Sequence, residues 1–335
     1  MPALHLDRLT KTFHARAKRA GGWKRWAGLI RPEPPVEVAA VAGISFAIAA
    51  RECVAFIGPN GAGKSTTLKM LTGILTPSAG SAEVNGLVPW TARRQLARSI
   101  GIVFGQRSQL WPSLPVADSF WLIGRIYGLD AGPFQRRRDR LVDAFQLADL
   151  VDRPAAQLSL GQRMRCEIAA ALLHAPTILF LDEPTIGLDV TAKAALRDHL
   201  NALAREDGTT VLLTSHDTGD IEKICERAIV IDHGRLVMDS SLTDLRREFL
   251  GRRVVTVTTA EEEPRLALAG VEELAREPYR LTLAVDTGAV SVERVVVALL
   301  DRYGISDLMI ENPPLEEVIK AIYRHSARAR EKVPA

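Results

Sequence analysis

The segment Gly58-Pro-Asn-Gly-Ala-Gly-Lys-Ser65 carries the clearest chemistry in the sequence. It matches the pattern G-x-x-x-x-G-K-[ST], in which glycines let backbone N–H groups turn inward around phosphates, ahead of the positive end of a helix. Lys64 supplies a mobile charge for the β- and γ-phosphates, and the Ser65 hydroxyl ligates Mg²⁺. A nucleoside triphosphate site is therefore predicted, with these contact residues: Gly58, Pro59, Asn60, Gly61, Ala62, Gly63, Lys64, Ser65 and Thr66.

Two carboxylates end a later apolar run, Ile178-Leu-Phe-Leu-Asp182-Glu183. In open α/β sheets, ligands bind at the carboxyl ends of the strands, which is where both side chains would lie. We expect Asp182 to hold the metal ion and Glu183 to act as the general base on water, an effect worth roughly 10²- to 10⁴-fold in rate. His216 ends another apolar run and would reach the γ-phosphate from the same edge; a capping or core role is the alternative.

The apolar runs that carry these residues alternate with helical segments, which predicts an α/β fold with a parallel sheet and right-handed crossovers. The fold class expected is a P-loop NTPase sheet with a helical subdomain. A mostly helical stretch lies around residues 116–150. The remaining expected elements are strands at 4–13, 38–49, 53–57, 178–181, 210–214 and 228–232, and helices at 64–71, 190–205 and 220–226.

The 335 residues suggest roughly two domains, at about 150 residues each. The composition changes near Gly251, and residues 252–327 have the pattern strand, helix, two strands, helix, strand, helix, which is typical of a small α+β, ferredoxin-like domain. We expect a first domain at 1–245 and this accessory domain at 252–327. Within the first, a basic insertion is expected around 14–36 and the helical subdomain around 107–165.

Five motifs follow one another in an informative order. The phosphate loop is followed by Leu158-Ser-Leu-Gly-Gln-Arg163, Leu181-Asp-Glu-Pro184, Gly187-Leu-Asp189 and His216. Over residues 4 to about 240 this order resembles the ATP-binding subunits of ABC transporters. The resemblance implies ATP and Mg²⁺ as ligands, ATP hydrolysis, and a working dimer. The segment at 158–163 resembles the family's signature motif, with Leu160 where glycine is commoner.

The resemblance also implies roles for residues outside the phosphate loop. Gln106 matches the glutamine that senses Mg²⁺ or water and couples to the membrane subunit. Phe13 matches the aromatic that stacks on adenine, an interaction worth about 1–3 kcal/mol, and a core role in the first strand is the alternative. The residues implied to act across the dimer, on ATP held by the opposite subunit or in communication with it, are Ser159, Gly161, Gln162 and Asp189.

The signature form, the run Leu-Asp-Glu-Pro-Thr-Ile-Gly-Leu-Asp189 and the C-terminal appendage resemble the exporter branch of this family. Its relatives act on drugs, lipids, polysaccharides or sodium ions. The partners implied are an integral-membrane permease and a second ATP-binding subunit, as a homodimer. The alternative is a soluble ABC ATPase acting on ribosomes or DNA, whose relatives usually fuse two cassettes or carry long coiled coils or zinc cysteines.

Composition and charge bound the remaining possibilities. The chain is 47% hydrophobic and 25% charged, as in globular proteins, and its net charge of +3 gives no reason to expect a nucleic-acid partner. The longest uncharged stretch is 14 residues, whereas a spanning helix needs about 20. With no apolar leader at the N-terminus, we expect a peripheral protein on the cytoplasmic face of the cell membrane. Free buried thiols are expected for Cys53, Cys166 and Cys225.

Two further segments have a composition that would suit contact with a membrane surface or with the permease. Six basic residues and two tryptophans fall in the insertion, and Trp23, Trp26 and Ile30 share one helical face, so residues 14–31 either lie on a membrane surface or pack on the protein. Apolar side chains follow Gln106 and form either a groove for a cytoplasmic helix of the permease or part of the core. They are Leu110, Trp111 and Leu114.

Overall fold

A computed structural model describes residues 2–15, 36–105, 108–206, 208–215, 217–248, 252–312 and 315–331. The chain divides into two compact units, Met1–Asp239 and Ser240–Ala335. Residues 16–35 of the predicted basic insertion lie outside the described residues, as do Gln106 and His216.

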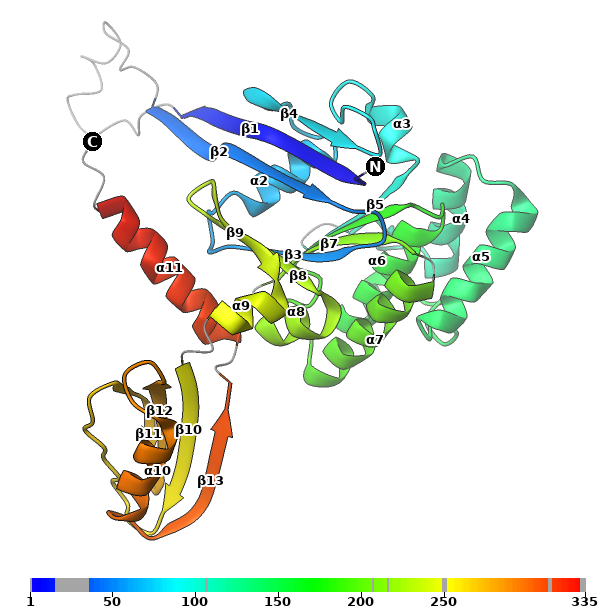
Figure 1. Cartoon of the computed structure of the whole chain (residues 1–335). Coiled ribbons are helices and arrows are strands. Elements are labelled where there is room, and N and C mark those ends of the chain that lie inside the picture. The colour runs from blue at the N-terminus through cyan, green and yellow to red at the C-terminus, as the bar shows by residue number, and fades with distance from the viewer. Residues whose placement is uncertain are drawn as a thin grey trace, which may run out of the picture. The chain divides into compact units, whose positions relative to one another are not determined.

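A six-stranded sheet forms the centre of the first unit, in the order β5-β6-β7-β3-β8-β9 (Figure 1). Neighbouring strands from β5 to β8 run parallel, as the alternation of strands and helices predicts. β3 and β7 are buried at every residue, which explains their unbroken apolar runs. The strands are β3 (Cys53–Ile57), β5 (Ile100–Phe104), β6 (Ile178–Asp182), β7 (Thr210–Thr214), β8 (Arg227–Asp232) and β9 (Arg235–Ser241).

A second, antiparallel sheet consists of β1 (Leu4–Ala15), β2 (Val36–Ile48) and β4 (Ala79–Val84), in the order β2-β1-β4. Helix α2 (Lys64–Leu71) lies on the side of the central sheet that faces this second sheet (Figure 1). Apolar side chains of both sheets and α2 form one buried core, which includes Leu6, Ile44, Phe46, Phe56, Leu68, Phe180 and Leu212. The core therefore fixes α2, and with it the turn that precedes α2.

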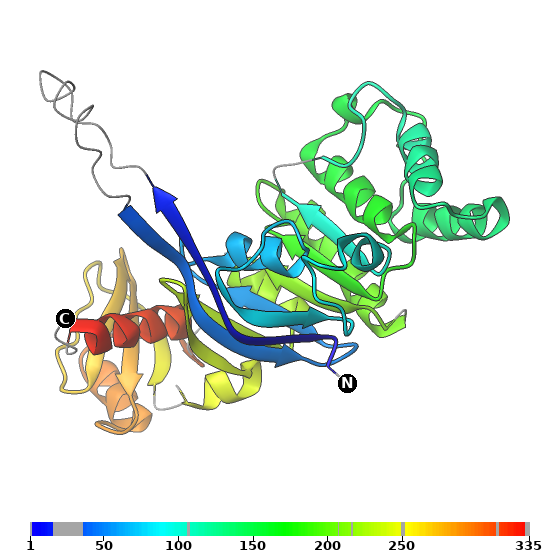
Figure 2. The ribbon, with the colours of Figure 1, turned by 90° about the horizontal axis from the view of Figure 1, so that it is seen from above.

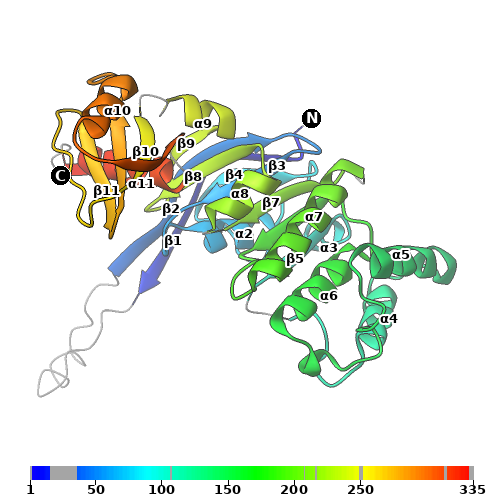
Figure 3. The ribbon, with the colours of Figure 1, turned by 90° about the horizontal axis from the view of Figure 1, so that it is seen from below.

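The opposite face of the central sheet is covered by α6 (Leu160–Leu172), α7 (Val190–Glu206) and α8 (Thr218–Ile224), which Figure 3 shows from below. Helices α4 (Val116–Ile126) and α5 (Ala131–Ala144) project beside the β5 edge (Figure 2). The short helices α3 (Arg93–Ala97) and η1 (Ala155–Gln157) precede β5 and α6. The helical stretch expected around residues 116–150 is thus two helices, α4 and α5.

The second unit contains a four-stranded antiparallel sheet, in the order β11-β12-β10-β13. Its elements are α9 (Leu242–Glu248), β10 (Arg252–Thr259), β11 (Val271–Glu277), β12 (Arg280–Asp286), α10 (Val292–Leu300), β13 (Ile305–Glu311) and α11 (Leu315–Glu331). The strand order is that of a ferredoxin-like sheet. Val295 and Leu299 of α10 pack with Val255, Leu283 and other sheet residues in a separate core.

One expected element of this unit is wrong: residues 260–270 form no helix between β10 and β11. Backbone groups of this segment are bonded to other parts of the unit. Glu262 O accepts a hydrogen bond from Tyr279 N at 3.0 Å, and Arg265 N donates to Tyr303 Oη at 2.8 Å. Leu266 and Leu268, two residues apart, both pack against the core, and this spacing fits an extended chain rather than a helix.

Candidate phosphate site

The turn from Ile57 to Lys64 connects the buried strand β3 to α2. Gly61 and Gly63 have φ of +82° and +105°, a backbone conformation that favours glycine. A Cβ at Gly63 would overlap the carbonyl oxygen of Ala40, so the glycine is also needed for space. No side chain caps the start of α2, and the N–H groups of its first turn are therefore free to bind an anion.

Lys64 is the first residue of α2 and is only 7% exposed. Its ammonium donates hydrogen bonds to the carbonyl oxygens of Gly58 and Pro59, the latter at 3.2 Å. Burial lowers the pKa of Lys64 below its ordinary value, and the nearby carboxylates of Glu183 and Asp182 act in the opposite direction. A cation held by carbonyls in a poorly solvated turn fits an anionic ligand, because a phosphate would offset the cost of its burial.

Three strand ends meet beside this turn, because the strands are in register. Asp182 of β6 is paired with Thr214 of β7 and with Phe104 of β5, and Thr214 is paired with Phe56 of β3. Consequently Ser65 Oγ donates to Asp182 Oδ2 at 3.1 Å, and Thr214 Oγ1 donates to Asp182 Oδ1 at 2.7 Å. Residues 117 positions apart in the chain are thus in direct contact.

The Ser65–Asp182 pair suits Mg²⁺. One hydroxyl and one carboxylate oxygen are hard ligands of the kind Mg²⁺ takes together with substrate phosphates and water. In the part of the chain that the structure describes, no group of three or more His, Cys, Asp or Glu side chains is placed to hold a metal. A soft or fully protein-ligated metal therefore has no site among those residues, whereas a phosphate-bound Mg²⁺ fits the donors present.

Glu183 follows β6 with φ of +55°, a conformation that costs a non-glycine residue about 1–3 kcal/mol. Two hydrogen bonds hold it there: its N–H donates to Thr214 O at 3.1 Å and to Thr214 Oγ1 at 3.0 Å. The backbone therefore turns away from the strand direction directly after Asp182. On the neighbouring strand end, Ser215 is buried and Asp217 begins the next helix, one on each side of position 216.

The residues implied to act across a dimer form a second group around the starts of α6 and α7. Helix α6 begins at Leu160, whereas the sequence, through its resemblance to the family, predicts a helix beginning near Gln162. Its cap is Ser159: Gln162 N donates to Ser159 Oγ at 3.3 Å, and Ser159 N donates to Gln162 Oε1 at 3.0 Å. A Cβ at Gly161 would lie 2.9 Å from Ala192 Cβ, so this turn packs tightly on the start of α7. Asp189 caps α7, accepting from Ala192 N at 2.8 Å.

The structure also decides two alternatives left open by the sequence. Phe13 lies on β1 opposite Val38, and with 41% exposure it is not a core residue. Lys11 Nζ lies 5.4 Å from the centroid of its ring. Leu110 is 3% exposed and belongs to the core, whereas Trp111 is 37% exposed. Cys53, Cys166 and Cys225 are buried free thiols, as expected.

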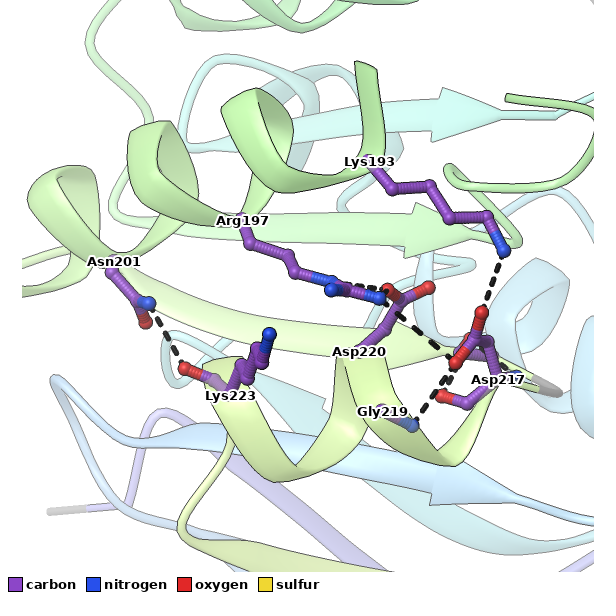
Figure 4. Close-up of polar contacts among 8 residues, drawn as sticks. Lys193, Arg197, Asn201, Asp217, Gly219, Asp220 and Lys223 are labelled. Carbon is purple, nitrogen blue, oxygen red and sulfur yellow. Dashed lines mark hydrogen bonds and ion pairs between the residues drawn. The ribbon is translucent and has the colours of Figure 1, made fainter. Parts of the chain in front are cut away.

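Sequence reasoning missed a set of polar side chains that joins α7 to α8 (Figure 4). Lys193 Nζ donates to Asp217 Oδ2 at 2.6 Å, Arg197 pairs with Asp220, and Asn201 Nδ2 donates to Lys223 O at 2.9 Å. The three α7 residues are spaced by four positions, which places them on one face of the helix. That spacing is a sequence signal, although it does not indicate the partners.

Comparisons with known proteins agree with this geometry. The family described as ABC transporter matches residues 41–186. The linearmycin resistance ATP-binding protein of Bacillus subtilis (strain 168) is 31% identical over 287 residues, which cover 83% of this chain and 91% of that protein. Nod factor export ATP-binding protein I of Rhizobium sp. (strain N33) is 34% identical over 280 residues, covering 83% and 90%.

Solved structures give the same result. The structure of an ATP-binding subunit of an ABC transporter has a TM-score of 0.60 and 26% identity, covering 74% of this chain and 93% of that one. A dimeric ATP-binding cassette in a post-hydrolysis state, bound to ADP and Pi, has a TM-score of 0.59 and 26% identity, covering 71% and 98%. The fold and site define an ATPase, and the chain belongs to the ATP-binding proteins of the ABC transporter family.

Proposed function

We propose that this chain is the ATP-binding subunit of an ABC exporter, which closes as a dimer on ATP and powers a separate membrane permease. The observation that carries the proposal is the Ser65–Asp182–Thr214 contact beside the buried Lys64, at the aligned strand ends. Lys64, the Ser65–Asp182 pair and Glu183 lie close together at this edge, which supports the roles proposed for them below. The names of relatives support export: they are proteins of linearmycin resistance, Nod factor export and daunorubicin resistance.

The proposed hydrolysis relies on positioning and charge rather than on a covalent intermediate. Backbone N–H groups of Gly58 to Thr66 bind the phosphates, and Lys64 neutralises the β- and γ-phosphates. Ser65, Asp182 and Gln106 would hold Mg²⁺, and the bound ion would supply positive charge to offset that of the phosphate oxygens. Glu183 takes the proton from the attacking water. His216 contacts the γ-phosphate, and Phe13 stacks on the adenine.

The second group of residues completes the site of a partner copy. Ser159, Gly161 and Gln162 would act on ATP held by the opposite subunit, from the N-terminal end of α6. Asp189, at the start of α7, would communicate the state of one site to the other. A homodimer therefore has two equivalent sites, and each chain contributes half of each.

The remaining assignments concern the whole chain. Residues 1–245 form the ATP-binding cassette, with 107–165 as its helical subdomain, and residues 252–327 form an accessory domain. No helix in the described ranges is long and apolar enough to cross a membrane. The partner is an integral-membrane permease, and the chain binds to it at the cytoplasmic face of the cell membrane. Trp111 would contribute to that interface, and residues 14–31 would touch the membrane surface.

The test of the ATPase assignment is the Glu183→Gln variant. We expect its turnover to fall by about 10²- to 10⁴-fold while bound ATP is retained and a dimer appears in size-exclusion chromatography. Hydrolysis at the wild-type rate would show that Glu183 is not the base. The transporter assignment is tested by isolating the chain from native membranes in mild detergent and identifying its partners by mass spectrometry. Recovery of ribosomes or nucleic acid instead of a multi-span permease would contradict it.

A further inference from the structure

Figure 4 shows the polar contacts that join α7 to α8: three short contacts, which differ in their surroundings, and a longer ion pair of 4.0 Å between Arg197 and Asp217. The middle contact is the most buried: the side chains of Arg197 and Asp220 are 13% and 0% exposed. The Lys193–Asp217 contact is more open, at 25% and 34% exposure. Asn201 bonds a backbone carbonyl at the far end of both helices. The middle contact therefore anchors the helix pair, and the two outer contacts align its ends.

The Lys193–Asp217 contact lies where both helices begin. Asp189 caps α7, and Lys193 N donates to Asp189 O at 2.9 Å, so Lys193 is one turn from that cap. Asp217 caps α8, because its Oδ1 accepts from Gly219 N at 3.0 Å. An ion pair of 2.6 Å between Lys193 and Asp217 thus connects the first turns of two helices whose caps are Asp189 and Asp217, and Arg197 lies 4.0 Å from the other oxygen of the same carboxylate.

Asp217 is also fixed from the other side. Its N–H donates to Ser215 Oγ at 3.0 Å, and Ser215 is buried at the end of β7. The hydrogen bond from Lys193 holds the pKa of the Asp217 carboxyl below its ordinary value, which favours its charged form. The β7–α8 connection is therefore held between the central sheet and the first turn of α7.

We propose that Lys193 is a positioning residue, whose ion pair with Asp217 holds the β7–α8 connection in register with the Asp189 turn. The inference rests on the proposed function, in which Asp189 communicates with the partner subunit and the β7–α8 connection contributes to the γ-phosphate site. Through this contact, a shift of the Asp189 turn on dimer closure moves the β7–α8 connection with it. Lys193 is not among the residues proposed to bind ATP or to activate water.

The experiment compares Lys193→Met with Asn201→Ala, both made in the full-length chain. Each variant removes one α7–α8 contact, but only the first removes the contact at the helix starts. Lys193→Met keeps the aliphatic stem, and Asp217→Asn keeps a good helix cap while breaking the ion pair. Lys193→Arg restores the charge. Steady-state ATP hydrolysis gives kcat and KM, and thermal unfolding gives the stability of each variant.

We expect Lys193→Met and Asp217→Asn each to lower kcat by between about tenfold and a hundredfold, as for a small misplacement near the reacting groups. The KM for ATP should stay within about twofold, since no ATP contact is lost. The double variant should be no slower than either single one. Lys193→Arg should recover most of kcat, and Asn201→Ala should match the wild type in kcat.

The first two of the following results would overturn the inference in different ways, because only the second also contradicts the proposed function. If Lys193→Met and Asn201→Ala have equal kcat while the wild type hydrolyses ATP, the ion pair has a structural role only and the proposed function stands. If the wild type shows no hydrolysis above a Lys64→Ala background, the proposed function fails and the inference fails with it. A third result would also contradict a positioning role for Lys193: kcat and thermal stability fall together in both Lys193→Met and Asn201→Ala, and Lys193→Arg does not restore kcat.

Discussion

Glu167 offers a direct test of how the site's supporting structure is held. This residue lies on α6 with 4% exposure, and its carboxylate accepts hydrogen bonds from Ser108 Oγ and from Gln109 N, the latter at 2.8 Å. Ser108 and Gln109 closely follow position 106 in the chain, so Glu167 ties that segment to the helix that Ser159 caps. Burial is the largest cause of a raised pKa for Glu167, and the hydrogen bonds from Ser108 and Gln109 oppose it.

Two substitutions separate these effects. Glu167→Ala removes both acceptors and leaves a cavity, and the partly buried Gln109 N–H loses its partner; we expect a loss of about 2–3 kcal/mol in the free energy of unfolding. Ser108 loses less, because its single hydroxyl proton can turn to Leu110 O, 3.1 Å away, as an alternative acceptor. Glu167→Gln keeps the volume and one acceptor and removes a poorly solvated charge, so its loss should stay under about 1 kcal/mol.

The pH dependence of stability shows whether burial or hydrogen bonding dominates the pKa of Glu167. A carboxyl group with a raised folded-state pKa binds its proton more tightly in the folded protein. Its contribution to stability is therefore greatest below the unfolded-state pKa, and it declines as the pH rises through the folded-state pKa. Urea unfolding of the wild type and Glu167→Gln between pH 4 and 8 should show the wild type losing stability relative to the variant as pH rises. A difference that grows in favour of the wild type would refute the reasoning, because hydrogen bonds rather than burial would then dominate.

Two other substitutions test the structure elsewhere. Lys64→Met should raise the unfolding midpoint of the nucleotide-free protein, because it removes a buried ammonium whose pKa is lowered. The variant should also lose the stabilisation by ATP, which for the wild type is about 2.7 kcal/mol when ATP is in hundredfold excess over its Kd. Thermal unfolding with and without ATP measures both effects, and a variant that ATP still stabilises would contradict the proposed contact between Lys64 and the phosphates. Arg227→Met should lower the free energy of unfolding by about 2 kcal/mol, because Arg227 of β8 pairs with Glu52, directly before β3, at 2.9 Å and with Asp239 of β9 at 2.6 Å. Urea unfolding measures the loss, and a value below about 0.5 kcal/mol would show that water replaces these bonds.

The sequence predicts β3, β6, β7 and β8 of the six-stranded sheet but not β5 or β9. β3, β6 and β7 contain runs of three to five consecutive apolar residues that are buried on both faces, and such runs can be recognised without knowing their neighbours. β4 escaped prediction because its sequence, Ala-Gly-Ser-Ala-Glu-Val, has only two buried residues. Its place is decided by pairing with β1, where a Cβ at Gly80 would overlap the carbonyl oxygen of Arg8. That contact depends on tertiary structure.

The start of α6 shows a signal that was present and not used. Ser159 and Gln162 have the S-x-x-Q spacing of a capping box, which places the first helical residue at 160 rather than near 162. The helix predicted after the first strand of the second domain is wrong, because residues 260–270 form no helix and pack in part as extended chain. The Lys193–Asp217 contact was beyond sequence reasoning, since nothing in either residue's neighbourhood indicates a partner 24 positions away.

The convergence of the site follows from strand register. Side chains alternate along a strand, so a slip of one residue between β6 and β7 would turn either Asp182 or Thr214 to the opposite face of the sheet. The hydrogen bond of 2.7 Å between them, and the two bonds that hold Glu183 at its positive φ, would be lost together. The buried apolar side chains that precede these residues in β6 and β7 pack in this register, so a slip would also disrupt the packing of the core. The hydrophobic core therefore sets the geometry of the metal ligand and the general base, although none of its residues takes part in the chemistry.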